Sequence, residues 1–419
     1  MQQINPLKSV SGTLIVPSSK SYAQRAIAIA SLCDTGTLLK NLTDCDDVIA
    51  AQNVVKTLGA EIKKDNRDLH FLKPILKKIN RDHEINCAES GLSTRLFSGF
   101  SLLFDQKFKV TGTGSINNRT MEMVIDALQQ FGKVVISEDG CLPLTISGKI
   151  KNYEIEIDGA VSSQLLTGLL IIAPVLEKDT VIHVHSLKSI PYIDMTIEIL
   201  SDFGVEVKNK AYKAFYIKGN QTPKNKLYQI EGDWSGASFL IVAAALGGEI
   251  RLEGLNPKSK QADKKILEAI TQFGSNYCWE NDALIVKKNK NNAFVFDATH
   301  CPDLFPPLAV LAACAQGKST IKGVSRLTHK ESNRALTITE EFEKLGIEVH
   351  LNGDEMHIVG KGESTFVKGG TVSSRNDHRI AMALALFGLR TENPIFIEHP
   401  EAIDKSYPGY FEDLMKIIG

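Results

Sequence analysis

Apolar and polar positions along the chain form a block that repeats. An amphipathic stretch of helical period, such as MEMVIDALQQ or ALTITEEFEK, ends in a bulky apolar residue and a glycine, and two short strand-like runs follow. The junction recurs as TLGAEI, QFGKVV, DFGVEV, QFGSNY and KLGIEV, at intervals of 70 to 73 residues, and one further interval reaches Gly419. The glycines of the five junctions are Gly59, Gly132, Gly204, Gly274 and Gly346.

A glycine directly after a helix is typical of a C-terminal cap in the left-handed conformation. The recurrence of helix, glycine and strand pair therefore predicts six copies of one α/β unit of about 72 residues. Because 419 residues exceed one ordinary core, we expect two or three domains.

Composition restricts the kind of partner. The net charge is −1, which gives no general attraction to nucleic acid or to an anionic membrane. The longest apolar runs, 165–176 and 239–246, are shorter than the roughly 20 residues of a membrane span, so they predict buried helices. Seven scattered cysteines without a CxxC pair, no metal-ligand spacing and no apolar leader in MQQINPLKSV favour a cytoplasmic protein without a bound metal.

Several predicted helices begin with cations, although the partial positive charge of a helix N-terminus favours anions there. In PSSKSYAQR, Lys20 and Ser21 follow a cap at Ser18 or Ser19, and Arg25 shares their face. The other starts carry Arg119 after an expected Asn118 cap, the i,i+4 pairs Lys330 with Arg334 and Arg375 with Arg379, and Lys405. Cations that recur beside free N–H groups predict sites for phosphate or carboxylate ligands.

Other predicted starts carry neutral groups or carboxylates. Ser162, Ser163 and Gln164 precede one apolar helix, and Gly91 with Arg95 begins another. Each of these has an ordinary reading as a cap or an ion-pair partner. The same holds for Asp303 and Glu331, whose functional reading is proton transfer in an anion site, where neighbouring charges tune the pKa.

Nine segments, in order along the full length, resemble the EPSP synthase family, the 3-phosphoshikimate 1-carboxyvinyltransferases. They are PSSKSYAQRAIAIASL, TDCDDV, DGAVSSQLLTGLL, SIPYIDMTIEILSDFGVEV, IEGDWSGASFLIVAAAL, HCPDLFPPLAV, HKESNR, NDHRIAMALAL and DKSYPGYFEDL. The resemblance implies an α/β fold of two domains, each with three βαβαββ-type repeats around a pseudo-threefold axis. It places residues 19–231 in one domain and 1–18 with 232–419 in the other, with the active site in the cleft between them.

The implied reaction transfers the enolpyruvyl group of phosphoenolpyruvate to the 5-hydroxyl of shikimate 3-phosphate in aromatic amino-acid biosynthesis. It uses these two small-molecule substrates and no cofactor, and the family expectation is a monomer. The 5-hydroxyl attacks C2 of phosphoenolpyruvate while C3 gains a proton, and the tetrahedral adduct then loses phosphate. The groups implied to move protons are Asp303, Glu331 and Lys20.

The resemblance also assigns binding residues. Those for shikimate 3-phosphate are Lys20, Ser21, Arg25, Ser162, Ser163, Gln164, Ser189, Tyr192, Asp303 and Lys330. Those for phosphoenolpyruvate are Lys20, Gly91, Arg119, Gln164, Arg334, Arg379 and Lys405.

The chain departs from the family at the phosphoenolpyruvate loop, which usually reads close to NAGTAMR. Here the loop reads ESGLSTR, so Glu89 replaces an asparagine and Leu92 a threonine, whereas Gly91 and Arg95 keep their places. The changes add a carboxylate and remove a hydroxyl at the site that, in the family, also binds glyphosate, a mimic of phosphoenolpyruvate. Asn333 and Arg326 stand where aspartate and asparagine occur in other members.

Three rival functions are considered at this stage. One is enolpyruvyl transfer to UDP-N-acetylglucosamine, which uses the same fold, and the SKS start, the VSSQ segment and the KES block argue against it. Another is a binding protein without catalysis, to which the altered loop gives some support. A third, the RNA 3′-phosphate cyclase relatives, is remote because near-neutral charge and the lack of a P-loop offer little for RNA or ATP.

Overall fold

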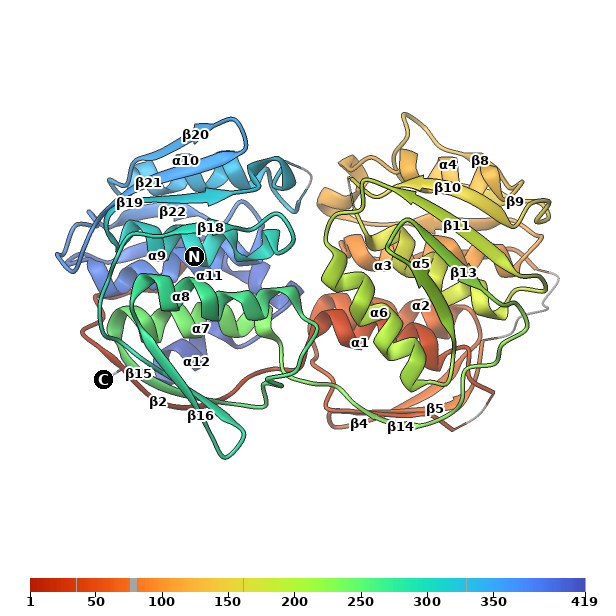
Figure 1. Ribbon diagram of the computed structural model, residues 1–419, viewed down its shortest axis with the longest axis horizontal. Helices are drawn as coiled ribbons and strands as arrows, with labels where there is room; N and C mark the ends of the chain where they lie inside the picture. Colours follow the sequence, from red (N-terminus) through yellow and green to blue (C-terminus); the bar gives the residue numbers. More distant parts are fainter. Residues whose placement is uncertain (35, 76–80, 161, 329, 419) are drawn as a thin grey trace. The chain divides into compact units, whose positions relative to one another are not determined.

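The computed structural model describes residues 1–34, 36–75, 81–160, 162–328 and 330–418 (Figure 1). The chain forms two compact units, one of Ser19–Ile230 and one of Met1–Ser18 with Glu231–Gly419. The boundary expected from the sequence lies one residue away, because Glu231 belongs to the second of these units. Each unit is described below by itself.

The unit of residues 19–230 contains three four-stranded sheets. Their strand orders are β14-β3-β5-β4, β6-β7-β9-β8 and β10-β11-β13-β12. The strands are β3 (Leu38–Lys40), β4 (Glu61–Asp65), β5 (Asp68–Lys73), β6 (His83–Asn86), β7 (Phe108–Thr111), β8 (Val134–Ile136), β9 (Leu144–Ser147), β10 (Glu154–Asp158), β11 (Thr180–His185), β12 (Val207–Lys210), β13 (Ala214–Ile217) and β14 (Leu227–Gln229). The helices are α1 (Lys20–Ala30), α2 (Asp46–Thr57), α3 (Gly91–Ser98), α4 (Glu122–Gln130), α5 (Gln164–Ile172) and α6 (Ile190–Asp202).

The other unit contains two four-stranded sheets, β16-β17-β15-β2 and β18-β19-β21-β20, and the three-stranded sheet β1-β23-β22. The strands are β1 (Gln2–Ile4), β2 (Val10–Ile15), β15 (Gly248–Glu253), β16 (Asn276–Glu280), β17 (Ala283–Lys287), β18 (Val295–Asp297), β19 (Gln316–Lys322), β20 (Val349–Asn352), β21 (Glu355–Lys361), β22 (Gly370–Ser373) and β23 (Ile395–Glu398). The helices are α7 (Trp234–Gly247), α8 (Ile266–Phe273), α9 (Phe305–Ala313), α10 (Arg334–Lys344), α11 (His378–Leu386) and α12 (Tyr410–Lys416).

One repeat shows how the sequence pattern becomes structure. In β6-α3-β7-α4-β8-β9 the first two strands pair in parallel across a helical crossover, and the last two form an antiparallel hairpin. The repeats that begin with β10 and β18 have the same pairings. Two repeats take their first strand from a distant part of the chain: β14 pairs in parallel with β3, and β2 with β15.

The glycines at the helix ends adopt the conformation that the sequence predicts. Gly59, Gly132, Gly204, Gly274 and Gly346 have φ of 100°, 95°, 74°, 100° and 83°. An alanine is strained at such values, whereas glycine is not. Gly419, the sixth predicted position, lies outside the described residues.

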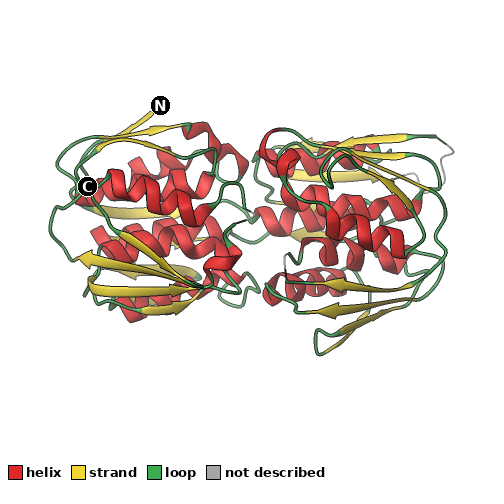
Figure 2. Ribbon diagram, turned by 90° about the horizontal axis from the view of Figure 1, so that it is seen from above, coloured by secondary structure: helices red, strands yellow, loops and turns green. Residues whose placement is uncertain are grey.

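Helices lie between the sheets of each unit (Figure 2). All nine residues of α9 and all nine of α11 are buried, including His378 and Arg379, because these helices contact each other and α7. A helix that is apolar on every side belongs inside a core, which explains the uninterrupted apolar runs in the sequence. Within the described ranges, no helix combines the length and the apolar character that crossing a membrane requires.

Candidate active site

The start of α1 holds Lys20 as predicted. Ser19 is the N-cap, and its hydroxyl accepts a hydrogen bond from the Tyr22 backbone N–H. The Lys20 ammonium lies 2.9 Å from a carboxylate oxygen of Asp47 in α2. Because both side chains are largely buried, this pair fixes the ammonium at the helix start.

Arg25 is a buried cation, with 2 % of its surface exposed. Its guanidinium donates to Thr196 Oγ1 at 3.0 Å, to Thr167 Oγ1 at 3.3 Å and to the carbonyl of Ser21 at 2.8 Å. Burial lowers its pKa to about 10, so the group is still charged at neutral pH. Among the residues that the structure describes, no carboxylate forms an ion pair with it. A buried guanidinium surrounded by neutral oxygens favours an anionic ligand.

The bonds of Arg25 bring the start of α1 to α5 and α6. Ser163 is the N-cap of α5, and Gln164 is its first residue. Ser162 Oγ accepts from the Gln164 N–H at 3.2 Å. Ser189, buried and with φ of 58°, precedes α6, and Arg25 reaches the carbonyl of Tyr192 in its first turn at 3.4 Å. These are the predicted hydrogen-bonding groups for shikimate 3-phosphate, and they come from three neighbouring helix starts.

A second group of predicted residues meets at the start of α3. Arg95 donates to Gln164 Oε1 at 3.1 Å. A Cβ on Gly91 would lie 3.0 Å from Arg119 Nη1 and 3.3 Å from Arg95 Nη1, so the absence of a side chain leaves room for both guanidinium groups. Two cations, an amide and free helix N–H groups at one place suit a phosphate or carboxylate.

Arg119 does not lie at a helix start, contrary to the sequence prediction. The 3-10 turn η2 (Gly114–Asn118) ends before it, Arg119 is extended, and α4 begins only at Glu122. Asn118 is used inside η2 and caps no α-helix. Arg119 Nη2 donates to Ser115 Oγ at 3.4 Å, and its buried Nε has no hydrogen-bond partner in the part of the chain that the structure describes.

Gln24 connects these groups, although no pattern in the sequence singles it out. Its amide donates to Ser90 Oγ and Ser93 Oγ, each at 2.8 Å, and to the carbonyl of Asp47 at 3.3 Å. It therefore ties α1 to the N-cap of α3 and to the residue that holds Lys20.

In the other unit, Arg334 is the centre of an ion cluster and is 1 % exposed. It donates to Asp377 Oδ2 at 2.7 Å, to Asp303 Oδ1 at 2.6 Å and to Glu331 Oε2 at 2.5 Å. Asp303 also contacts Lys330 at 3.2 Å and Arg379 at 3.2 Å. The predicted group of Asp303, Lys330, Glu331, Arg334 and Arg379 is thus assembled in one place.

The charges of this cluster set its protonation. Burial by itself raises the pKa of Asp303, but Arg379, Lys330 and Arg334 outweigh burial and hold that pKa well below its usual range. Burial lowers the pKa of Lys330, and Asp303 opposes the change. Asp303 is therefore an ionised hydrogen-bond acceptor at neutral pH.

Two predicted i,i+4 pairs are not helical pairs. Asn333 caps α10, so the helix begins at Arg334 and Lys330 precedes it. Asp377 caps α11, so Arg375 lies before the helix with φ of 51° and pairs with Glu341 at 2.8 Å instead. In both cases the helix begins at a polar N-cap that lies between the two cations, which avoids placing like charges on one turn.

Lys405 is the last residue of the 3-10 turn η8 (Pro400–Lys405). Its ammonium donates to the carbonyl of Asn376, next to the Asp377 cap, at 2.8 Å. Asp377 itself was missed, although its place before the apolar stretch HRIAMALAL is the signal of an N-cap.

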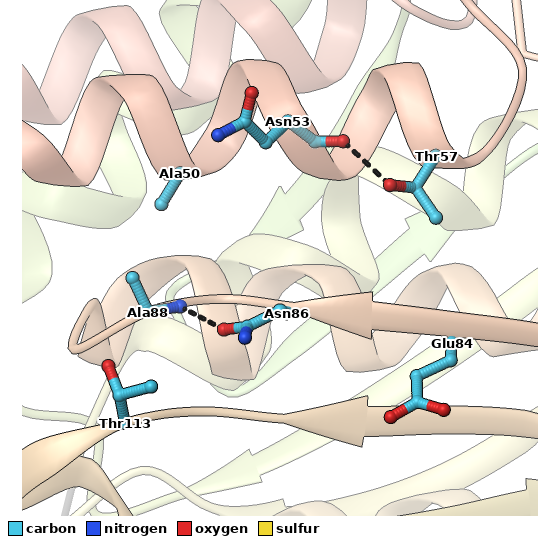
Figure 3. A pocket seen from close by; sticks show the side chains of 7 residues that line it. All are labelled: Ala50, Asn53, Thr57, Glu84, Asn86, Ala88 and Thr113. Atoms are coloured by element: carbon cyan, nitrogen blue, oxygen red, sulfur yellow. Dashed lines mark hydrogen bonds between the residues drawn. The ribbon is translucent and has the colours of Figure 1, made fainter.

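A separate hollow of about 360 Å³ lies between α2 and the β6–β7 edge in the unit of residues 19–230 (Figure 3). It is lined by Ala50, Asn53, Thr57, Glu84, Asn86, Ala88 and Thr113. None of these is a predicted site residue, and the two visible hydrogen bonds there are local ones within the chain.

Known proteins are similar to this chain over its full length. Residues 4–414 match the family described as EPSP synthase (3-phosphoshikimate 1-carboxyvinyltransferase). Curated relatives named 3-phosphoshikimate 1-carboxyvinyltransferase include those of Clostridium acetobutylicum, 37% identical, and Clostridioides difficile, 36% identical; both alignments cover 100% of this chain and 97% of the relative. A solved EPSP synthase from Acinetobacter baumannii has a TM-score of 0.81 and 26% identity, covering 100% of this chain and 98% of that one.

The repeats, the two units and the likeness to a solved EPSP synthase define an enolpyruvyl transferase fold, which confirms the fold class predicted from the sequence. The chain belongs to the EPSP synthase family. It is an enzyme that transfers the enolpyruvyl group of phosphoenolpyruvate to shikimate 3-phosphate, and of the two acceptors considered from the sequence the relatives' names support this one.

Proposed function

We propose that the predicted residues of the unit 19–230 and those of the other unit carry out this transfer together. Shikimate 3-phosphate is bound by Ser21, Arg25, Ser162, Ser163, Gln164, Ser189 and Tyr192, with Asp303 and Lys330 on its hydroxyls. Phosphoenolpyruvate is bound by Gly91, Arg119, Gln164, Arg334, Arg379 and Lys405, and Lys20 serves both substrates. Arg25 carries most weight in this proposal, because it is a buried charge whose described partners are all neutral.

In the proposed reaction Asp303 accepts the hydrogen bond of the attacking 5-hydroxyl. Its low pKa makes it a weak base, so the proton moves as the oxygen bonds to C2 and not before. Glu331 and Lys20 exchange the proton at C3: C3 receives a proton as the adduct forms and loses one as phosphate leaves. The surrounding cations neutralise the phosphate that leaves the tetrahedral adduct.

The reaction is tested by phosphate release in steady state with phosphoenolpyruvate and each acceptor. Release with shikimate 3-phosphate and none with UDP-N-acetylglucosamine is expected. A chain that binds both substrates without releasing phosphate would be a binding protein, and the proposal would be wrong.

The role of Asp303 is tested by Asp303→Ala. We expect kcat to fall about 10²- to 10⁴-fold, the range typical of a lost proton-transfer group, with binding of phosphoenolpyruvate largely kept. Asp297→Ala is the matched control, because this carboxyl ends the preceding strand β18 and its described bond is a local one to Thr299. Near-normal turnover in Asp303→Ala would exclude the assignment.

A further inference from the structure

Glu89, which replaces the usual asparagine of the phosphoenolpyruvate loop, points to a second segment of the chain. Its Oε1 accepts a hydrogen bond from the Ser115 backbone N–H at 3.1 Å. Ser115 belongs to the first turn of η2, the 3-10 segment that ends directly before Arg119. A neighbouring bond joins the same two loops, from the Thr113 N–H to the Ala88 carbonyl at 2.9 Å.

Gly114 makes room for this carboxylate. It has φ of 59°, and a Cβ built on it would lie 1.4 Å from Glu89 Oε1. The carboxylate therefore occupies the space in which any other residue would carry its side chain. Since the clashing atom is the end of a flexible side chain, an alanine at this position would displace the carboxylate and leave the core in place.

The same turn holds Arg119. The hydroxyl of Ser115 accepts from Arg119 Nη2 at 3.4 Å, and Arg119 Nη1 lies beside Gly91, two residues after Glu89. Contacts thus lead from Glu89 through Ser115 and Arg119 back to Gly91, two residues along the same loop. A carboxylate that accepts a hydrogen bond from the first N–H groups of a helical turn stabilises that turn.

We propose that Glu89 and Gly114 together form a latch that positions Arg119 for phosphoenolpyruvate. Glu89 is a positioning residue: it acts through the η2 turn and touches no substrate. The inference rests on the proposed function, because it assumes that Arg119 binds phosphoenolpyruvate. It also explains how this chain carries a carboxylate beside an anion site, since the carboxylate is turned to a backbone N–H.

The test is steady-state kinetics of the full-length enzyme. Glu89→Ala should raise KM for phosphoenolpyruvate about tenfold, as one lost positioning hydrogen bond predicts, with kcat and KM for shikimate 3-phosphate within about twofold. Glu89→Gln keeps an acceptor oxygen and should restore KM to within about twofold of the parent value.

Gly114→Ala should raise the same KM by a similar factor, because it expels the carboxylate. The double variant should be no worse than either single one, since each change breaks the same latch. Glu84→Ala is the control for loss of a nearby carboxylate. Gly353→Ala is the control for backbone strain, because Gly353 has φ of 57° and no atom of the described residues lies within 4 Å of its Cβ position.

Arg119→Ala separates this inference from the proposed function. If it raises KM for phosphoenolpyruvate but Glu89→Ala does not, the latch is refuted and the proposed binding role of Arg119 stands. If Arg119→Ala leaves KM unchanged, both are wrong. Multiplying effects in the double variant, or equal losses in kcat and in both KM values, would also refute the latch.

Discussion

At the scale of single residues, Asp263 is a carboxyl whose pKa is set mainly by burial. It is fully buried, Ser235 Oγ donates to its Oδ2, and its Oδ1 has no hydrogen-bond partner in the described ranges. Burial, with the charge of Asp303 adding to it, raises the pKa of Asp263 to about 6, although Arg379 opposes the change. The folded protein therefore holds a proton there that the unfolded chain releases above about pH 4.

This difference makes stability depend on pH. Because the pKa is raised on folding, the contribution of Asp263 is favourable at low pH and is lost as pH rises from about 4 through 6, by about 3 kcal/mol at most. We expect Asp263→Asn, which keeps the neutral form, to raise the melting temperature relative to the parent at pH 7.5 and by about half as much at pH 5. Equal shifts at both pH values would show that Asp263 is ionised in the folded protein throughout.

Single residues also show what a sequence can predict of a site. Lys20 and Arg334 were found because cations at helix starts are unusual. The structure places Arg334 against Asp303, another predicted residue, and Gly91 beside Arg119. Asp263 and Gln24 gave no such signal. Their importance depends on which distant residues surround them, and that follows from packing of the core and not from a local pattern.

At the scale of elements, the helix-ending glycines differ in what surrounds them. All five need the left-handed conformation, but Gly274 is also crowded: a Cβ there would lie 2.7 Å from Lys290 Cβ and 2.9 Å from Asn292 Nδ2. At Gly346 the nearest atom is Lys368 Cε at 3.1 Å, near the mobile end of its side chain.

We therefore expect Gly346→Ala to cost about 1–2 kcal/mol, the strain of the left-handed conformation alone. Gly274→Ala should cost about 1–3 kcal/mol more, because the Lys290 Cβ is fixed to the backbone. Thermal unfolding of both variants measures the difference. Equal melting temperatures would mean that the segment 290–292 moves away without cost.

Element types were more predictable than element starts. Helix, glycine and hairpin follow from local propensity and period, and the repeats have these elements as expected. The helix starts predicted near Lys330 and Arg375 were wrong because Asn333 and Asp377 are the N-caps. The start predicted near Arg119 was wrong because the 3-10 turn η2 ends there and no α-helix begins. Several neighbouring polar residues could each serve as the N-cap, and the sequence alone does not show which of them does.

At the scale of the whole molecule, the two units differ in how their sheets are built. Every strand of the three sheets in residues 19–230 comes from that continuous stretch. The other unit needs both ends of the chain, because β2 pairs with β15 and β1 with β23.

We expect a chain of residues 19–230 alone to fold and to melt cooperatively. Residues 231–419 alone should aggregate, because the edges of β15 and β23 are left uncovered. Joining residues 1–18 to 231–419 through a two-residue glycine linker should restore folding, because Ser18 already bridges Gly232 and the Pro17 carbonyl accepts from the Asp233 N–H at 2.8 Å. Circular dichroism shows which of the three chains is folded. A folded chain of residues 231–419 alone would contradict the expectation.

The pairing of β1 with β23 also has a consequence for synthesis on the ribosome. Gln2 pairs with Ile397 and Val10 pairs with Gly248, so residues 1–18 are made before residues 19–230 but have no partner until β15 and then β23 are made. The stretch that follows it, up to Ile230, can close its own core long before then. During translation the nascent chain therefore carries the unpaired segment of β1 and β2 ahead of a folded unit. We expect a chaperone to matter most at this stage, because unpaired strand edges aggregate.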